Sequence, residues 1–168
     1  DKVTGRAKFG ADLMVPGALV GKVLRSPHAH AVIKSIDCSK AEALAGVKAV
    51  VTGADFPDFP QGTMPGDMTR NCMAREKVLY EGHALAAVAA TSESVAKAAL
   101  KLIEVDYEVL PHVIDPAAAK APDAPILHDH IRTKGDADAA DAPTNVTERL
   151  DIGMGDVDKG FAEIGRAS

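Results

Sequence analysis

The sequence predicts an α+β fold, with a mixed sheet and a few short helices. Several segments rich in β-branched or alternating apolar residues have the length of strands. They lie at 19–26, 32–36, 47–52, 77–80, 85–90 and 103–109. Residues 92–103 instead carry apolar side chains at helical spacing. The 168 residues, 46% hydrophobic and 26% charged, suffice for one domain with a buried core.

The first two strands are expected at 19–26 and 32–36, with a bend between them. Pro27 lies in this bend and cannot donate a hydrogen bond within a sheet. A short helix is expected next, because Ser39 and Glu42 have the spacing of a capping box.

Gly46 is expected to end this helix in a left-handed conformation, before the valine-rich strand at 47–52. Residues 53–69 contain several prolines and glycines, so we expect an irregular surface loop there. Two further strands are expected on either side of a turn at Gly82.

Ser92 is expected to cap a helix that lies on a surface. Its apolar face would contain Val95, Ala98, Ala99, Leu102 and Ile103. The last strand, at 103–109, alternates apolar and acidic residues, which is typical of a strand with one solvated face, and it ends at Pro111.

The rest of the chain differs in composition. Residues 117–142 are rich in Ala, Asp, Pro and Lys, so few side chains offset the entropy of ordering, and we expect mobility, above all at 135–141. A final helix is expected from the spacing of Val157, Phe161 and Ile164. The predicted divisions are a core at 1–116, a mobile extension at 117–147 and a connecting segment at 148–168.

Charge and cysteine content exclude several classes of protein. The net charge of −5, without a basic run, disfavours nucleic acid and anionic membranes as partners. No apolar stretch approaches the ~18 residues that cross a bilayer. Cys38 and Cys72 are too few and too far apart to hold an iron–sulfur cluster. We expect both to be free thiols in a reducing compartment, the cytoplasm.

His28 and His30 form an H-x-H pair, whose rings would project to one side of a strand, as a metal site could require. Further ligands would have to come from histidines that show no recognisable ligand spacing. These are His83, His112, His128 and His130. We therefore favour a structural role for the pair at the bend and assign no metal ligand.

Two glycine- or aspartate-rich motifs have a structural interpretation. Residues 153–160 superficially suggest a phosphate loop, but the glycine spacing is wrong, and Asp156 is expected to cap a helix instead. Asp136, Asp138 and Asp141 resemble the start of a calcium loop that lacks its glycine and final glutamate. We expect a solvated acidic loop.

No residue set in the sequence predicts catalysis. Asn145 begins a glycosylation sequon of little weight without a secretory signal, and Asp106 and Glu108 are expected on a solvated strand face. There is no G-x-S-x-G motif and no cysteine paired with a histidine. We assign no catalytic, cofactor-binding or metal-binding residue.

A series of short motifs occurs in order along the chain. They are Lys2–Ala7, Leu24–Ala31, Ile36–Asp37, Ala43–Val47, Lys77–Gly82, Ala86–Val88, Val105–Pro111, Pro125–His128, Asn145–Val146 and Gly155–Val157. Together they resemble the N-terminal α/β hammerhead domain of the molybdenum-binding large subunit of the xanthine dehydrogenase and aldehyde oxidase family. One departure is His83-Ala84, where the family most often has a polar residue and then proline.

The resemblance implies that the whole protein is the large subunit of a molybdenum hydroxylase of the aldehyde oxidase, xanthine dehydrogenase or carbon monoxide dehydrogenase type. Such an enzyme uses molybdopterin, with 2Fe-2S and FAD on partner domains or subunits, to oxidise an aldehyde or a heteroaromatic ring. Residues 148–168 would start the connection to the molybdenum-binding domains. The family's catalytic glutamate and pterin loops match no position here, so this segment alone is expected to be inactive.

Two other interpretations remain open. The chain could be an autonomous small binding or adaptor module that shares the fold. It could also be a metal-binding domain built on its histidines. If it is instead a supporting domain, we expect an exposed apolar patch where its neighbours pack.

Overall fold

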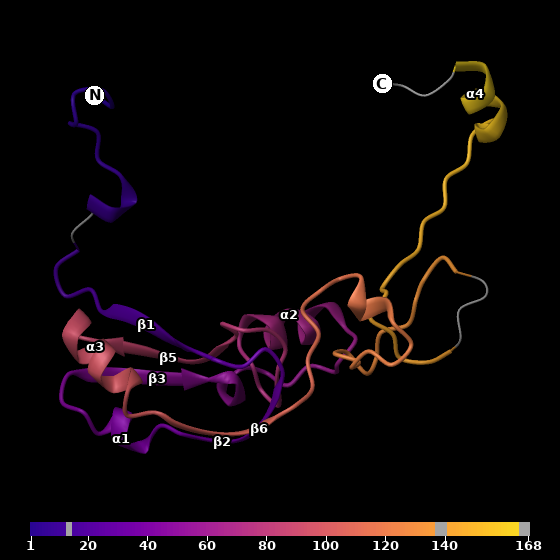
Figure 1. The fold of residues 1–168 in the computed structure, drawn as a ribbon. Helices are drawn as coiled ribbons and strands as arrows, with labels where there is room; N and C mark the ends of the chain where they lie inside the picture. The colour runs from indigo at the N-terminus through magenta and orange to yellow at the C-terminus, as the bar shows by residue number, and fades with distance from the viewer. Residues whose placement is uncertain (13–14, 137–140, 165–168) are drawn as a thin grey trace. The chain divides into compact units, whose positions relative to one another are not determined.

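The structure is a computed structural model that describes residues 1–12, 15–136 and 141–164. It divides into two compact units, unit 1 (Asp1–Ile114) and unit 2 (Asp115–Ser168). Figure 1 shows the strands together in unit 1, whereas unit 2 is mostly irregular chain. Each unit is described by itself.

Unit 1 contains two three-stranded sheets. The first has the order β1 (Val20–Arg25), β5 (Ala84–Ala90), β3 (Val47–Thr52), and the second has the order β4 (Lys77–Val78), β2 (Ala31–Asp37), β6 (Glu104–Val109). Every pairing in these sheets is antiparallel, and none joins strands that are consecutive in the chain. The α+β class is confirmed, but two antiparallel sheets with crossing connections replace the expected mixed sheet and local hairpins.

The described residues of unit 1 form three α-helices, two of which pack on the first sheet, while the third lies apart from them (Figure 1). They are α1 (Ser39–Glu42), α2 (Met64–Cys72) and α3 (Glu93–Leu100), with 3-10 turns at Gly10–Asp12 and Gly53–Asp55. Helix α3 packs on β1 and β5, while α1 packs on β3 and α3. Among the helices that the structure describes, none has the length and apolar character needed to span a bilayer.

Two apolar clusters form the core of unit 1, and both consist mostly of small side chains. The larger one lies between the first sheet and helices α1 and α3, and contains Ala41, Ala86, Val88, Ala90, Ala96, Ala99 and Ile103. The smaller one contains Ala31, Ala74, Val78 and Leu85. Leu24, Ile36 and Val105 pack against both clusters, so the two sheets share one continuous interior.

Of the two helix caps predicted in unit 1, one is confirmed and the other is wrong. The Ser92 hydroxyl accepts a hydrogen bond from the Val95 amide at 3.3 Å, as expected. Ser39, in contrast, is already inside α1, and its amide donates to the carboxylate of Asp37 at 2.9 Å. The capping box fails because the carboxylate two residues earlier satisfies the first free amide. In α3, the buried residues are Ala96 and the expected Ala99, while the expected Ala98 is exposed.

The irregular loop predicted at 53–69 is only partly present, because α2 begins at Met64. The Thr63 hydroxyl caps this helix by accepting from the Gly66 amide at 3.2 Å. Amides in the first turn of a helix have no partner within the helix, so a proline, which lacks this amide, is tolerated there. The proline content that suggested a loop is therefore compatible with a helix start. A Cβ at Gly66 would lie 2.1 Å from the Pro60 carbonyl oxygen, so the glycine permits the close approach of the loop.

Unit 2 has little regular structure: a 3-10 turn at Ala118–Lys120 and α4 (Val157–Ile164). Asp156 caps α4, since its carboxylate accepts from the Lys159 amide at 3.0 Å, as predicted. Residues 137–140, which include Asp138, lie outside the described residues. The mobility predicted for 117–142 stays a prediction.

Candidate functional site

The buried polar side chains of the described chain are Ser26, His30 and His83, with exposed fractions of 3%, 5% and 0%. They lie where the loop after β1 meets the turn before β5. The Ser26 amide donates to the His83 carbonyl, and the Gly82 amide donates to the Ser26 carbonyl, both at 2.9 Å. The two histidine-containing motifs are therefore joined by backbone hydrogen bonds.

His83 connects the end of α2 to this turn. Its Nε2 donates to the Arg70 carbonyl at 2.8 Å, and its Nδ1 accepts from the Leu79 amide at 3.2 Å. The ring stacks on Tyr80 at 4.3 Å, and the Tyr80 hydroxyl donates to the Asn71 carbonyl at 2.9 Å. Burial lowers the pKa of His83, so the imidazole is neutral and fully hydrogen-bonded. These contacts fix the turn at Gly82 and His83.

His28 and His30 have separate partners. The His30 Nδ1 donates to the Pro111 carbonyl at 2.8 Å, while the His28 ring contacts Tyr107 edge-on at 4.8 Å. The His28 amide also donates to the Ser26 hydroxyl at 3.0 Å. The arrangement supports the predicted structural role at the bend, because the rings pack against different neighbours instead of meeting.

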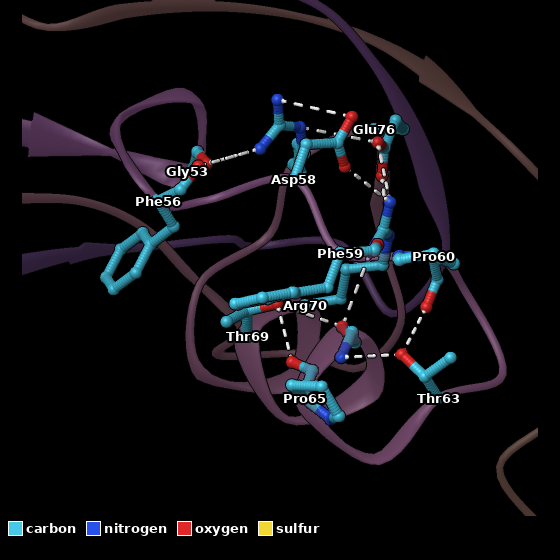
Figure 2. Close-up of polar contacts among 12 residues, drawn as sticks. Gly53, Phe56, Asp58, Phe59, Pro60, Thr63, Pro65, Thr69, Arg70 and Glu76 are labelled. Carbon is cyan, nitrogen blue, oxygen red and sulfur yellow. Dashed lines mark hydrogen bonds and ion pairs between the residues drawn. The ribbon is translucent and has the colours of Figure 1, made fainter.

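A cluster of four charged side chains, the arginine clamp (Asp58, Arg70, Arg75 and Glu76), holds the loop before α2 (Figure 2). Arg70 pairs with Asp58 at 3.2 Å and with Glu76 at 3.3 Å, and it also donates to the Phe59 carbonyl at 2.8 Å. Arg75 approaches the same two carboxylates at 3.8 and 3.6 Å. Each cation is matched by a carboxylate, so the clamp is a structural network and offers no uncompensated charge to a ligand.

Arg75 extends the clamp to the turn after β3. It donates to the Phe56 carbonyl at 3.1 Å and to the Gly53 carbonyl at 3.4 Å. A Cβ at Gly53 would lie 2.3 Å from the Ala74 carbonyl oxygen, so the backbones approach closely here. The depression beside the clamp, lined in part by Met73, has no interior space for a water molecule.

In unit 2, two aspartates of the expected acidic loop and the sequon asparagine have internal partners. Asp136 pairs with Arg149 at 3.4 Å, and Asp141 pairs with Arg132 at 3.2 Å. The Asn145 side chain accepts from the Leu127 amide at 3.2 Å and donates to the Pro125 and Ala119 carbonyls at 3.0 and 3.1 Å. With its amide nitrogen used in this way, Asn145 is a structural clip in the folded unit.

Two histidines that the sequence analysis left unassigned lie beside each other. The rings of His128 and His130 have centroids 5.8 Å apart and planes inclined by 78°. The sequence contains a signal for this pair, because His128 and His130 have the same H-x-H spacing as His28 and His30. His112 is exposed near the end of unit 1.

Neither the metal-ligating side chains of the described residues nor the depression beside the clamp fits a molybdopterin cofactor. Among them, no group of three or more His, Cys, Asp or Glu side chains could hold a metal ion. The depression beside the clamp cannot admit a pterin, and the arginines there are already paired. Cys38 and Cys72 are free thiols, and burial raises the pKa of the Cys38 thiol.

Two small antiparallel sheets and short covering helices define a small α/β domain. Residues 4–111 match the "Aldehyde oxidase and xanthine dehydrogenase, a/b hammerhead domain". The chain belongs to this family, which confirms the resemblance found in the sequence motifs.

Two relatives and one solved structure illustrate the similarity. The "Carbon monoxide dehydrogenase large chain" of Afipia carboxidovorans is 47% identical over 133 residues, which are 77% of this chain and 16% of that protein. The "Xanthine dehydrogenase molybdenum-binding subunit" of Escherichia coli is 35% identical over 136 residues, or 76% of this chain and 18% of that protein. The aldehyde oxidoreductase structure from Desulfovibrio gigas has a TM-score of 0.65 at 35% identity, covering 77% of this chain and 16% of that chain. This chain thus spans less than a fifth of each.

Proposed function

We propose that this chain is a structural domain of the large subunit of a molybdenum hydroxylase, and that it has no catalytic activity by itself. The match of residues 4–111 to the hammerhead domain carries this proposal. The two relatives bear the names of dehydrogenases, and the matched region is 16% and 18% of their length, so most of each enzyme lies outside it.

The contacts inside the domain favour a structural role. The polar groups at the histidine junction and the arginine clamp bond mainly to backbone carbonyls and to each other. Such contacts fix loop positions and leave no activated nucleophile or base. In the whole enzyme, molybdopterin would be held by the molybdenum-binding domains of the same chain, with 2Fe-2S and FAD on partner domains or subunits.

Exposed apolar side chains support packing against those neighbours. In unit 1 they include Val3, Phe9, Val15, Leu19, Val23, Phe59, Met64, Met68, Tyr80, Val109 and Ile114. In unit 2 they are Leu150, Ile152, Met154, Val157 and Phe161. Where such side chains lie together, they form the contiguous apolar patches that mark interfaces in soluble proteins. We infer that these side chains face the molybdenum-binding domains and the iron–sulfur and flavin units of a cytoplasmic enzyme that oxidises an aldehyde or a heteroaromatic compound.

The test compares the chain alone with a complete large subunit that contains it. We expect the isolated chain to purify without stoichiometric molybdenum and to reduce no dye with aldehydes or heteroaromatic substrates. A large subunit that lacks residues 1–114 should lose activity, and addition of the separate chain should restore part of it. Turnover by the isolated chain, or full activity of the truncated subunit, would overturn the proposal and favour an autonomous module.

A further inference from the structure

The two neighbouring histidines of unit 2 lie on a tight turn. The Ile131 amide donates to the His128 carbonyl at 3.3 Å, so His128 and His130 occupy the first and third positions of the turn. Both side chains are partly exposed, with ring centroids 5.8 Å apart. The His130 Nδ1 is buried, so a ligand from solvent has to bind this ring at Nε2.

Hydrogen bonds from two other side chains hold this turn in place. Asn145 binds the Leu127 amide and the Pro125 carbonyl on the segment that leads into it. Arg132 donates to the Asp129 carbonyl, between the histidines, at 3.0 Å. Ligands on a backbone fixed in this way lose little conformational entropy when they bind.

The ring separation is close to that of two imidazoles on one metal ion. With zinc–nitrogen bonds of about 2.1 Å and a tetrahedral angle, the centroids lie about 5.3 Å apart. The observed 5.8 Å differs by roughly half an ångström, which small side-chain rotations can supply. The pair His28 and His30 differs, because Pro111 and Tyr107 hold those rings separately.

We propose that His128 and His130 form a two-imidazole binding site for a borderline divalent transition metal, with Zn²⁺ as its probe. No third protein ligand gathers there among the described residues, so water completes the coordination. Imidazole nitrogens select such ions over Mg²⁺. Each histidine makes a further contact within the chain, so the metal competes with it and the affinity is modest. The proposal does not depend on the proposed molybdenum enzyme.

The test is a calorimetric Zn²⁺ titration of the whole 168-residue chain at pH 7.5. We expect one site, with the affinity reduced at least about tenfold in His128→Ala and in His130→Ala, since each removes one of two ligands. The exposed His112→Ala is the matched control and should leave the affinity unchanged. Mg²⁺ should give no signal.

A second measurement uses the unmodified chain, so it does not depend on whether a variant folds. Zn²⁺ should shift the NMR signals of the His128 and His130 rings first, and the shift should weaken as the pH is lowered to 5, because protons compete with metal ions for imidazole nitrogens. An affinity in both alanine variants that is unchanged from that of the original chain, or shifts confined to other histidines, would overturn the proposal.

Discussion

Unit 1 and unit 2 are stabilised by different kinds of contact. Every buried hydrophobic side chain in the described part of the chain belongs to unit 1, where two sheets and two helices share an alanine-rich interior. In the described part of unit 2 no side chain is buried, and Asn145, Arg132 and Arg149 tie the backbone together instead. The comparison teaches that apolar packing sets the fold of the first unit, and polar side-chain clips set that of the second.

The largest expected difference comes from removing one apolar side chain in each unit. Leu85 is fully buried, so Leu85→Ala should lower the free energy of unfolding by about 2–5 kcal/mol. Leu150 is 76% exposed, and Leu150→Ala, the matched control, should change it by less than about 0.5 kcal/mol. Urea unfolding followed by circular dichroism measures both. Equal losses in the two variants would break the comparison.

Removal of a polar side-chain contact should instead destabilise unit 2. Asn145→Ala removes three hydrogen bonds, which should cost about 1–3 kcal/mol of local stability in unit 2. Amide hydrogen exchange at Leu127 should accelerate accordingly, since this amide loses its acceptor. Asn145→Asp keeps that acceptor oxygen and should give a smaller effect at Leu127. The exposed Asn71→Ala serves as the control. If amide exchange at Leu127 accelerated in this variant as well, Asn145 would not be a specific clip.

These differences also explain how far the sequence could predict the molecule. The strands at 47–52 and 104–109 were found because valine content and alternation report side-chain burial directly. The pairing of β1 with β5 was not, since consecutive patterns do not encode which crossing connection a chain makes. Helix α2 was missed because its prolines suggested a loop although Thr63 caps the helix locally. Its position also depends on Arg70, which pairs with Asp58 a dozen positions earlier.

The candidate sites follow the same rule. The sequence predicted a structural role for His28 and His30, which their contacts support, but left His83 unassigned. Its role depends on the Arg70 carbonyl, and a sequence motif does not show which backbone carbonyl a side chain will bind. The three contacts of Asn145 likewise go to backbone groups that are distant in sequence, so the sequon was visible and the clip was not.

The free energy of unfolding of unit 1 should depend on pH because of the buried His83. The pKa of His83 is lowered in the folded state, so the neutral ring is favoured there. Below an unfolded pKa of about 6.5 the unfolded chain takes up a proton that the folded chain refuses, and stability falls by at most ~1.4 kcal/mol per pH unit until the folded pKa is reached. The difference in unfolding free energy between the original chain and His83→Asn, measured from pH 7.5 to 5, should therefore shrink as the pH falls. A pH-independent difference would show that burial of the neutral ring contributes no linkage.

The smallest expected effect tests polar contacts within unit 1, where packing dominates. Ser92 caps α3 by accepting from the Val95 amide, so Ser92→Ala should lower the free energy of unfolding by about 1 kcal/mol. Ser39 is also a serine at the start of a helix, but its side chain makes no cap contact, because Asp37 accepts from the Ser39 amide. Ser39→Ala should therefore change the unfolding free energy by less than about 0.5 kcal/mol. If both variants lost the same stability, serine content and not the cap geometry would govern these helix starts, and the contrast with the clips of unit 2 would weaken.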